Sequence, residues 1–425
     1  MTRLYGWLLA LYALSVCFGD AFGPHPWVPI PLAVLLGSSI LVGGSLFLKP
    51  RVRFTGGCFR LADLLLVAFV FTLGLSLLLS GEVEPTNIHH FLAYGVVVGV
   101  YYFFVKFLFA ADDTYVTYAS RIRTALALSV GLVSAYALLE FVDRNFVPLG
   151  VTRFVTFPGD EEPYIPIFLV FVRARGFMGE SGLLALFLNV LGPISLVYVR
   201  DRWGRLAAAA FLVLTGGAFC VTLSAGGLVF LAVGLAAAVF MYVADRAFLF
   251  VPVRALLIVV SVLALMATAL VTSPAEWLIP VTSKLALTDL SSGQERVQAW
   301  REALSVAAEH PLLGTGVGST SVERGSGVIS FYLTMLKEAG TVSLALILVF
   351  FALIFRRIMM LPSWNRFKYA YAVSFVAALC HYAIISDIWY PWLWLLCVFV
   401  TTEPHHAPVA ELTGSRRSPA PVQST

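Results

Sequence analysis

Four arginines stand out because few residues of this chain are charged. Arg173 and Arg175 lie in the stretch FVRARGFMGESG, and Arg296 and Arg301 lie in SSGQERVQAWREALSVAAEHP. A guanidinium group donates two parallel hydrogen bonds to a phosphate, so these arginines are candidates for binding a phosphate group. The alternative for the first pair is that both side chains extend from an apolar segment towards lipid headgroups and water.

Three residues are candidates for a general base: Glu180, His310 and Glu338. Each has a structural alternative. Glu180 stands at a predicted helix N-terminus, where negative charge is favoured. Glu338 adjoins Lys337, with which it could form an ion pair. His310 precedes Pro311 at a predicted helix end, where capping or packing is the alternative, so the base remains unassigned.

We expect no metal and no other cofactor. The guanidinium groups can neutralise a phosphate by themselves, and the first outer connection offers Asp20 without a DxD pair. The five cysteines show no CxxC spacing, so neither a zinc site nor a disulfide framework is indicated.

The elements that position these residues are predicted to be membrane helices. With 60% hydrophobic and 12% charged residues, the 425-residue chain has too little polar surface for a soluble globule. Runs of roughly 20 apolar residues can cross a bilayer as helices, and about 12 are predicted. They are residues 4–19, 28–48, 61–80, 89–110, 121–142, 180–199, 205–224, 227–244, 253–273, 329–355, 368–386 and 388–402. We therefore expect an all-α polytopic membrane protein.

The transmembrane domain is predicted to comprise residues 1–402. The first run, 4–19, has the basic start and apolar core of a signal peptide but no convincing cleavage site. We interpret it as a retained helix, with a cleaved signal peptide as the alternative. Residues 403–425 are rich in proline and serine and are predicted to form a disordered cytoplasmic tail.

The distribution of basic residues predicts the orientation. Most of the 28 lysines and arginines fall in alternate connections, while the short connections between them have none. Short positive loops stay in the cytoplasm, so both termini are predicted to be cytoplasmic. Two long outer segments, about 143–179 and 274–328, contain the four arginines. Long loops cross the membrane largely regardless of charge, so solvated surface charge is the alternative to a binding site.

Each long outer segment has a predicted local structure. The apolar run 167–172 is too short to cross and should enter the outer leaflet or pack over the helices. In the second segment, Ser292 and Glu295 form a capping box that begins a helix ending at His310. One face of this helix is predicted to be apolar, with the two arginines at its edges; it comprises Val297, Trp300, Leu304, Ala307 and Ala308. The following GTGVGS lacks the Lys-Ser/Thr of a nucleotide-binding loop and is interpreted as a flexible turn.

In this order, the motifs resemble the O-antigen ligase and O-antigen or exopolysaccharide polymerase superfamily. The resemblance rests on RARGFMGE at 173–180, on Ser292 to Gly316 of the second outer segment, and on YLTMLKEAGTVSLAL at 332–346. The hydropathy layout is similar over about residues 60–400. Arg173 and Arg296 match the family's arginines, whereas Arg175 and Arg301 are added from their position alone.

The resemblance implies an all-helical fold related to the C-type glycosyltransferases, with two long periplasmic loops, in a bacterial inner membrane. It implies transfer of a glycan from undecaprenyl diphosphate to a sugar hydroxyl on the periplasmic face, without metal or nucleotide sugar. The expected partners are this lipid-linked donor, a glycan or lipid-linked acceptor, membrane lipids and a chain-length regulator. No nucleic acid is expected.

Two departures from the family pattern bear on the activity. Ligases usually have a histidine just before the helix that follows the second loop, where this chain has Ile329 and Ser330. This difference favours a polymerase over a ligase that joins the glycan to lipid A core. Where the family has an arginine after a serine, Ala225 follows Ser224, so one expected arginine is missing.

Two other classes of protein remain as alternatives. A transporter of lipid-linked oligosaccharides normally needs charges deep in the membrane, whereas Lys106, Glu140 and Asp387 lie near the ends of predicted spans. A noncatalytic scaffold of envelope assembly would tolerate loss of both Arg173 and Arg296.

Overall fold

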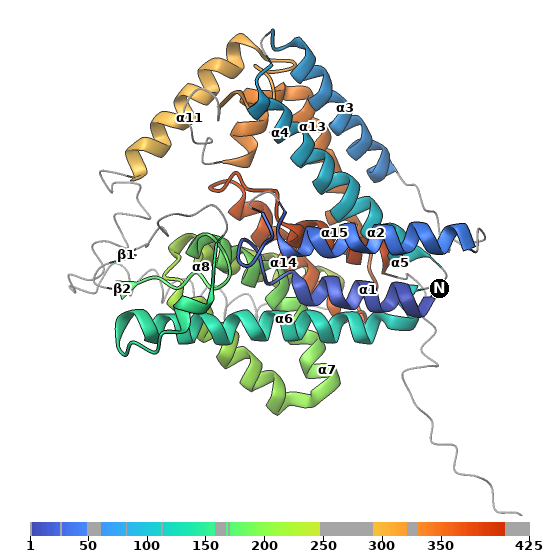
Figure 1. Ribbon diagram of the computed structural model, residues 1–425, viewed down its shortest axis with the longest axis vertical. Helices are drawn as coiled ribbons and strands as arrows, with labels where there is room; N and C mark the ends of the chain where they lie inside the picture. The colour runs from blue at the N-terminus through green and yellow to red at the C-terminus, as the bar shows by residue number, and fades with distance from the viewer. Residues whose placement is uncertain are drawn as a thin grey trace, which may run out of the picture.

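The computed structural model describes residues 2–25, 28–48, 61–81, 83–111, 114–157, 167–168, 171–246, 292–320 and 330–403. These residues form a predominantly helical protein, which confirms the predicted all-α class (Figure 1). The helices are α1 Thr2–Ser15, α2 Ile30–Leu48, α3 Leu61–Leu79, α4 Pro85–Val96, the π-helix η1 Val97–Phe104, α5 Val105–Ala110, α6 Thr114–Asn145, the 3-10 helix η2 Val151–Phe154, α7 Ser181–Val221, α8 Ala225–Arg246, α11 Ser292–Glu309, α13 Phe331–Met359, α14 Phe367–His381 and α15 Pro391–Thr402.

Six helical stretches of the described residues are long and apolar enough to cross a membrane. They are Leu61–Leu79, Pro85–Ala110, Thr117–Asn145, Ser181–Val221, Ala225–Asp245 and Phe331–Met359. The apolar parts of α2 and α15 are shorter, and α1 and α14 have 14 and 15 residues. The predicted span 253–273 lies outside the described residues, so the number of about 12 spans stays a prediction.

Glycines with positive φ interrupt two of the long helices. α7 bends at Gly204, φ 90°, which separates the predicted spans 180–199 and 205–224. α13 bends at Gly340, φ 74°, where the sequence predicted one uninterrupted run. A Cβ at Gly340 would overlap the carbonyl of Leu312, so the close packing of the preceding turn requires glycine here.

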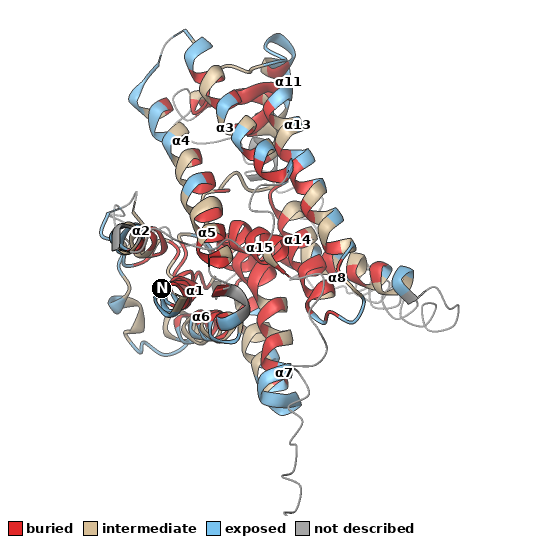
Figure 2. Ribbon diagram, turned by 90° about the vertical axis from the view of Figure 1, so that its right-hand side faces the viewer, coloured by how far each residue is buried: buried red, intermediate tan, exposed pale blue. Residues whose placement is uncertain are grey.

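The centre of the molecule consists of α14, α15 and the first half of α7, which are the most completely buried elements (Figure 2). Trp392 of α15 packs edge-on against Phe187 of α7 with ring centroids 5.3 Å apart, and its Nε1 donates to the carbonyl of Val16 at 2.9 Å. Outer helices expose large apolar side chains such as Ile40 and Leu206. A surface of this kind suits contact with lipid.

Ion pairs join the helix ends on the side predicted to be cytoplasmic. They are Lys106–Asp63, Arg366–Asp201 and Lys368–Asp245, each at 2.6 Å, and Arg123–Glu403 at 3.0 Å. Three of the basic partners lie in connections that the charge distribution predicts to be cytoplasmic: Arg123, Arg366 and Lys368. Packing and charge therefore agree on which helix ends share a side of the bundle.

The short apolar run in the first long outer segment forms a hairpin over a helix end. β1 Ile167–Phe168 and β2 Phe171–Val172 pair antiparallel, and β2 packs against α6. The amide of Asn145 accepts from the N–H of Val172 at 2.7 Å and donates to its carbonyl at 2.9 Å. Of the two expected arrangements, the structure shows packing over the helices.

The folded domain extends one residue beyond the predicted boundary at residue 402. Glu403 is buried, and its carboxylate accepts hydrogen bonds from Arg123, Tyr371 and Asn365. The prediction that the disordered tail begins at residue 403 is therefore wrong by one residue. Residues 404–425 lie outside the described residues.

The helix predicted in the second long outer segment is confirmed as α11, and the side that packs against the protein only partly coincides with the predicted apolar face. Ala299, Ala303 and Ala307 are buried, whereas Leu304 is 51% exposed. Alanines four residues apart share one side of a helix and allow close approach of the backbone to its neighbour, here α13. The side chains of residues 292–296 are not described, so the capping box stays a prediction.

Candidate functional site

The backbone of the first arginine motif is fixed by a buried carboxylate of α6. Glu140 is 1% exposed, and its Oε2 accepts from the N–H groups of Arg175 at 3.0 Å and Gly176 at 2.7 Å. Its Oε1 forms an ion pair with Arg144 Nε at 3.1 Å. A Cβ at Gly176, φ 63°, would lie 2.9 Å from Val133, so glycine is required for this close approach.

The two arginines of this motif have different surroundings. Arg173 is partly exposed, and its Nε donates to the carbonyl of Thr222, in the α7–α8 connection, at 2.8 Å. Arg175 is 3% exposed, with its guanidinium 4.0 Å from the ring centre of Phe157 and its Nη1 3.4 Å from the carbonyl of Gly179. The protein covers the guanidinium of Arg175, so the expected contact with a diphosphate does not fit its position. Arg175 instead stabilises the loop that leads to Gly179. Arg173 keeps access to a ligand.

Replacing Glu140 with alanine should lower the free energy of unfolding by about 3–5 kcal/mol. The change leaves the charge of Arg144 and two buried N–H groups without their partner. Thermal unfolding in detergent would measure it, with Glu309→Ala at the exposed end of α11 as a control that should change stability by at most about 0.5 kcal/mol. Equal effects of the two substitutions would contradict the anchoring role of Glu140.

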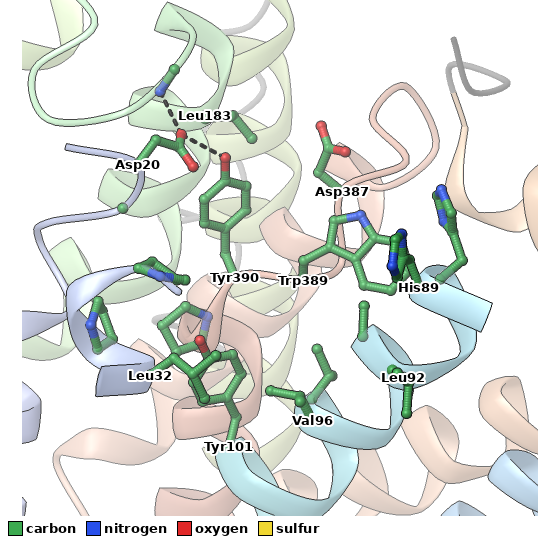
Figure 3. Close-up of a pocket in the computed structure, with 18 of the residues that line it drawn as sticks. Asp20, Leu32, His89, Leu92, Val96, Tyr101, Leu183, Asp387, Trp389 and Tyr390 are labelled. Atoms are coloured by element: carbon green, nitrogen blue, oxygen red, sulfur yellow. Dashed lines mark hydrogen bonds between the residues drawn. The ribbon is translucent and has the colours of Figure 1, made fainter. Parts of the chain in front are cut away.

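The arginine motif leads directly to a cavity of ≈ 800 Å³ (Figure 3). Its walls come from the connection between α1 and α2, from α4 with η1, from the start of α7 and from the start of α15. The polar residues that line it are Asp20, His89, His90, Glu180, Asp387 and Tyr390. Among the predicted base candidates, Glu180 is the one that lines this cavity.

Three carboxyl groups meet at this cavity. Asp20 accepts from the N–H of Gly179 at 2.6 Å and from the hydroxyl of Tyr390 at 2.7 Å (Figure 3). Glu180 is the N-cap residue of α7, but its side chain makes no capping hydrogen bond. Burial, and then the charges of Glu180 and Asp20, raise the pKa of Asp387 to about 7. Asp387 therefore changes its charge near neutral pH.

The raised pKa of Asp387 predicts a pH-dependent stability. Between about pH 4 and pH 7 the folded protein binds a proton that the unfolded chain has released, so stability falls as pH rises and then levels off. The substitution Asp387→Asn should remove about 2 kcal/mol of this fall in the free energy of unfolding. Partial exposure screens the charges and keeps the effect below that of a fully buried carboxyl group. Thermal unfolding of both proteins in detergent from about pH 4 to pH 8 would measure it. Parallel pH profiles would contradict the assignment.

The GTGVGS turn after α11 is held in place by Glu338 of α13. The Glu338 carboxylate accepts from the N–H groups of Gly318 at 2.9 Å and Thr320 at 3.2 Å, and its backbone carbonyl accepts from Gly316 at 2.9 Å. Glu338 is 2% exposed. The expectation of a catalytic Glu338 does not fit this geometry, because both carboxylate oxygens already bind backbone N–H groups. The turn is anchored, which also corrects its interpretation as flexible.

The anchored turn supports one wall of the cavity. The amide of Asn87 donates to the carbonyl of Val317 at 2.8 Å. A Cβ at Gly318 would lie 3.1 Å from Asn87 Cα and 3.2 Å from the Cβ of His90, which itself lines the cavity. The two long outer segments therefore reach the cavity from different sides: residues 179 and 180 line it directly, and the turn packs against His90.

The remaining predicted site residues lie on α11 or at its end. Arg301 and His310 are exposed, whereas the side chain of Arg296 is not described. α11 packs against α13, and Figures 1 and 2 place it at the end of the molecule that holds the upper parts of α3 and α4, away from α6. The structure thus brings Glu180 to the cavity and Arg173 near it in sequence, but it does not place the four arginines in one cluster.

Asp20, His89, His90 and Asp387 were not assigned to a binding or catalytic site from the sequence. Each lies in or beside a short connection predicted to be outer: DAFGPHPW, GEVEPTNIHH or SDIWYP. A signal was therefore present, because carboxylates, histidines and aromatic residues recur in connections that share one side of the membrane. The sequence could not show that these residues lie around one cavity, because their positions in space depend on how the helices pack.

No group of three or more His, Cys, Asp or Glu residues with the geometry of a metal site occurs in the described part of the chain.

The fold and the cavity define a polytopic, all-α membrane protein with an acidic cavity at the ends of its helices. Residues 210–337 match the O-antigen ligase family, and this match confirms the predicted resemblance. Over these residues the chain, a multi-pass membrane protein, is thus similar to the O-antigen ligase family. The match includes Arg296, Arg301 and His310, whereas Arg173 and Glu180 precede it. No curated protein matches the chain.

Proposed function

We propose that this protein transfers a glycan from undecaprenyl diphosphate to a sugar hydroxyl on the periplasmic face of the bacterial inner membrane, and that it polymerises lipid-linked repeat units. One observation carries the proposal. A single short segment, 173–180, begins with a partly exposed arginine held by Thr222 and ends with a carboxylate in the cavity. This segment supplies both an anion-binding group and a proton acceptor.

The proposed reaction needs few catalytic groups. The acceptor hydroxyl oxygen bonds to the anomeric carbon of the donor sugar, while the bond from that carbon to the diphosphate oxygen breaks and its electron pair leaves with the diphosphate. Glu180 accepts the hydroxyl proton. Arg173 stabilises the charge that develops on the leaving diphosphate, and Arg296 is the first candidate on α11 for a further contact with it. Attack opposite the leaving group inverts the configuration of the sugar.

Other residues support this arrangement from outside the reacting groups. Glu140 and Arg175 hold the 173–180 segment, and Glu338 holds the turn beside His90. Arg301 is the second candidate for diphosphate binding on α11. His310, exposed at the end of α11, is the alternative base.

The choice of a polymerase over a ligase rests on the start of α13. Ser330 occupies the region where ligases usually have a histidine, and here it caps the helix by accepting from the N–H of Leu333 at 3.5 Å. A residue used as a cap does not supply the imidazole expected of a ligase. Ligation to lipid A core or to another acceptor remains the alternative.

A transporter of lipid-linked oligosaccharides is the alternative from another class. In the described spans, Asp63 pairs with Lys106 and Glu140 pairs with Arg144 near helix ends. Glu338, inside the span Phe331–Met359, accepts from backbone N–H groups of the 316–320 turn. Charges paired at helix ends are less suited to coupling an ion to transport than unpaired charges at depth. This observation favours transfer over transport.

The test uses purified protein in liposomes with the lipid-linked repeat unit of its host, with and without a core-lipid acceptor, followed by gel electrophoresis. A ladder without added acceptor supports the polymerase. A single shift that requires core lipid supports the ligase instead. Movement of labelled headgroups across sealed vesicles, without a new glycosidic bond, would replace transfer with transport.

A further inference from the structure

We propose that the cavity binds the sugar that bears the attacking hydroxyl and that it selects neutral or amino sugars over uronic acids. The assignment of this sugar as the acceptor rests on the proposed function, whereas the selectivity follows from the cavity itself. Its ≈ 800 Å³ falls within the range of about 300–1,000 Å³ typical of small-molecule sites.

The charges that line the cavity have one dominant sign. Asp20, Glu180 and Asp387 enter from three separate parts of the chain. No lysine or arginine belongs to the described lining, where His89 and His90 are the groups that can become positive. A carboxylate on a bound sugar would meet like charges in a partly desolvated space, whereas an ammonium group would be attracted. Hydroxyl groups of a neutral sugar can donate to the carboxylates.

Aromatic side chains supply the other half of a sugar site. Tyr101, Trp389 and Tyr390 line the cavity. Trp389 is held by Tyr94, with ring centroids 4.4 Å apart, and Tyr390 stacks on Trp392 at the same distance. Rigid rings of this kind present large apolar faces, on which the C–H face of a pyranose can pack while its hydroxyls bind the carboxyl groups.

The same charges separate the sugar from the diphosphate. Three carboxyl groups would repel a diphosphate placed inside the cavity. Arg173 does not line the cavity but lies seven residues before Glu180, bonded to Thr222. The donor's diphosphate is therefore expected at the arginine, outside the cavity, and the acceptor sugar inside it. Glu180 lies at the boundary between the two.

The experiment compares methyl glucoside with two methyl glycosides that each differ from it in one substituent: methyl glucosaminide, with an amino group, and methyl glucuronide, with a carboxylate. Binding to the full-length protein in lipid nanodiscs would be measured by calorimetry at about pH 7.5, where Asp387 is mostly ionised. We expect the glucosaminide to bind about tenfold or more tightly than the glucuronide, with the glucoside between them.

Two variants and a control attribute this preference to the cavity. Asp387→Asn should narrow the ratio several-fold, because it removes charge without breaking the bond between Asp20 and Tyr390. The double variant Asp20→Asn, Asp387→Asn should bring the three affinities within about threefold. Asp201→Asn removes an exposed carboxylate paired with Arg366 outside the cavity and should leave the ratio unchanged.

Equal affinity for the three sugars, preference for the glucuronide, or binding of none of them would overturn the proposal. So would an unchanged preference in both cavity variants. Because the measurement does not require turnover, its failure differs from failure of the proposed function. A protein that shows the preference but makes no glycosidic bond retains the sugar site and loses the enzyme assignment. A protein that makes a ladder but binds the three sugars equally retains the enzyme assignment and loses the proposed sugar selectivity.

Discussion

Replacing Arg173 with alanine should reduce glycan transfer by about 10²–10³-fold, the loss typical of removing one donor that stabilises transition-state charge. Negative charge grows on the diphosphate as the glycosidic bond breaks, and Arg173 is the partly exposed arginine of the 173–180 segment. Its Nε bond to the carbonyl of Thr222 at 2.8 Å fixes the guanidinium before substrate binds. The measurement is the initial rate of ladder formation in liposomes.

Two further variants separate this role from a general effect of charge. Arg173→Lys keeps the charge but not the fork of parallel donors, so it should restore part of the activity. Arg153→Ala removes an exposed arginine of η2 in the same long outer segment and should leave transfer unchanged. If Arg173→Ala keeps transfer within about threefold of the original rate, the leaving group is stabilised elsewhere, and α11 becomes the first place to look.

Replacing Glu180 with glutamine should lower the turnover rate by about 10²–10⁴-fold, because an amide cannot accept the hydroxyl proton. The side chain makes no capping hydrogen bond at the start of α7, so its replacement should change stability by at most about 0.5 kcal/mol. A large kinetic effect combined with a small effect on stability is the signature of a reacting group rather than of a structural one.

The pH dependence of the rate is the second readout for Glu180. A rate that depends on a carboxylate base falls at low pH, where the protonated group can no longer accept a proton, and this limb should disappear in Glu180→Gln because an amide takes up no proton there. Glu309→Gln, at the exposed end of α11, should keep both the rate and the limb. If Glu180→Gln keeps an intact acid limb, His310 becomes the candidate base and the cavity loses its catalytic role.

The candidate site was only partly predictable. Glu180 was chosen from its motif and lies in the cavity, and Arg173 is accessible. Arg175, two residues later, packs under Phe157 because its backbone is drawn towards Glu140 on another helix. Glu338 shared the family motif with Gly340 but serves as an anchor, because the turn at 316–320 folds onto it. Motif spacing cannot distinguish a residue that meets substrate from one that holds the residues around it.

Local properties of the sequence by themselves determined the class of this protein. The excess of apolar residues predicts a membrane protein, the positions of arginine and lysine group the helix ends, and the capping signals and periodicity predict α11. Each depends on neighbouring residues or on the solvent, so each is readable along the chain. Tertiary structure alone decided that Asp20, Glu180 and Asp387 share one cavity. Residues so far apart in the sequence meet only because helix packing brings their segments together, and that packing depends on the shapes of all the buried side chains at once.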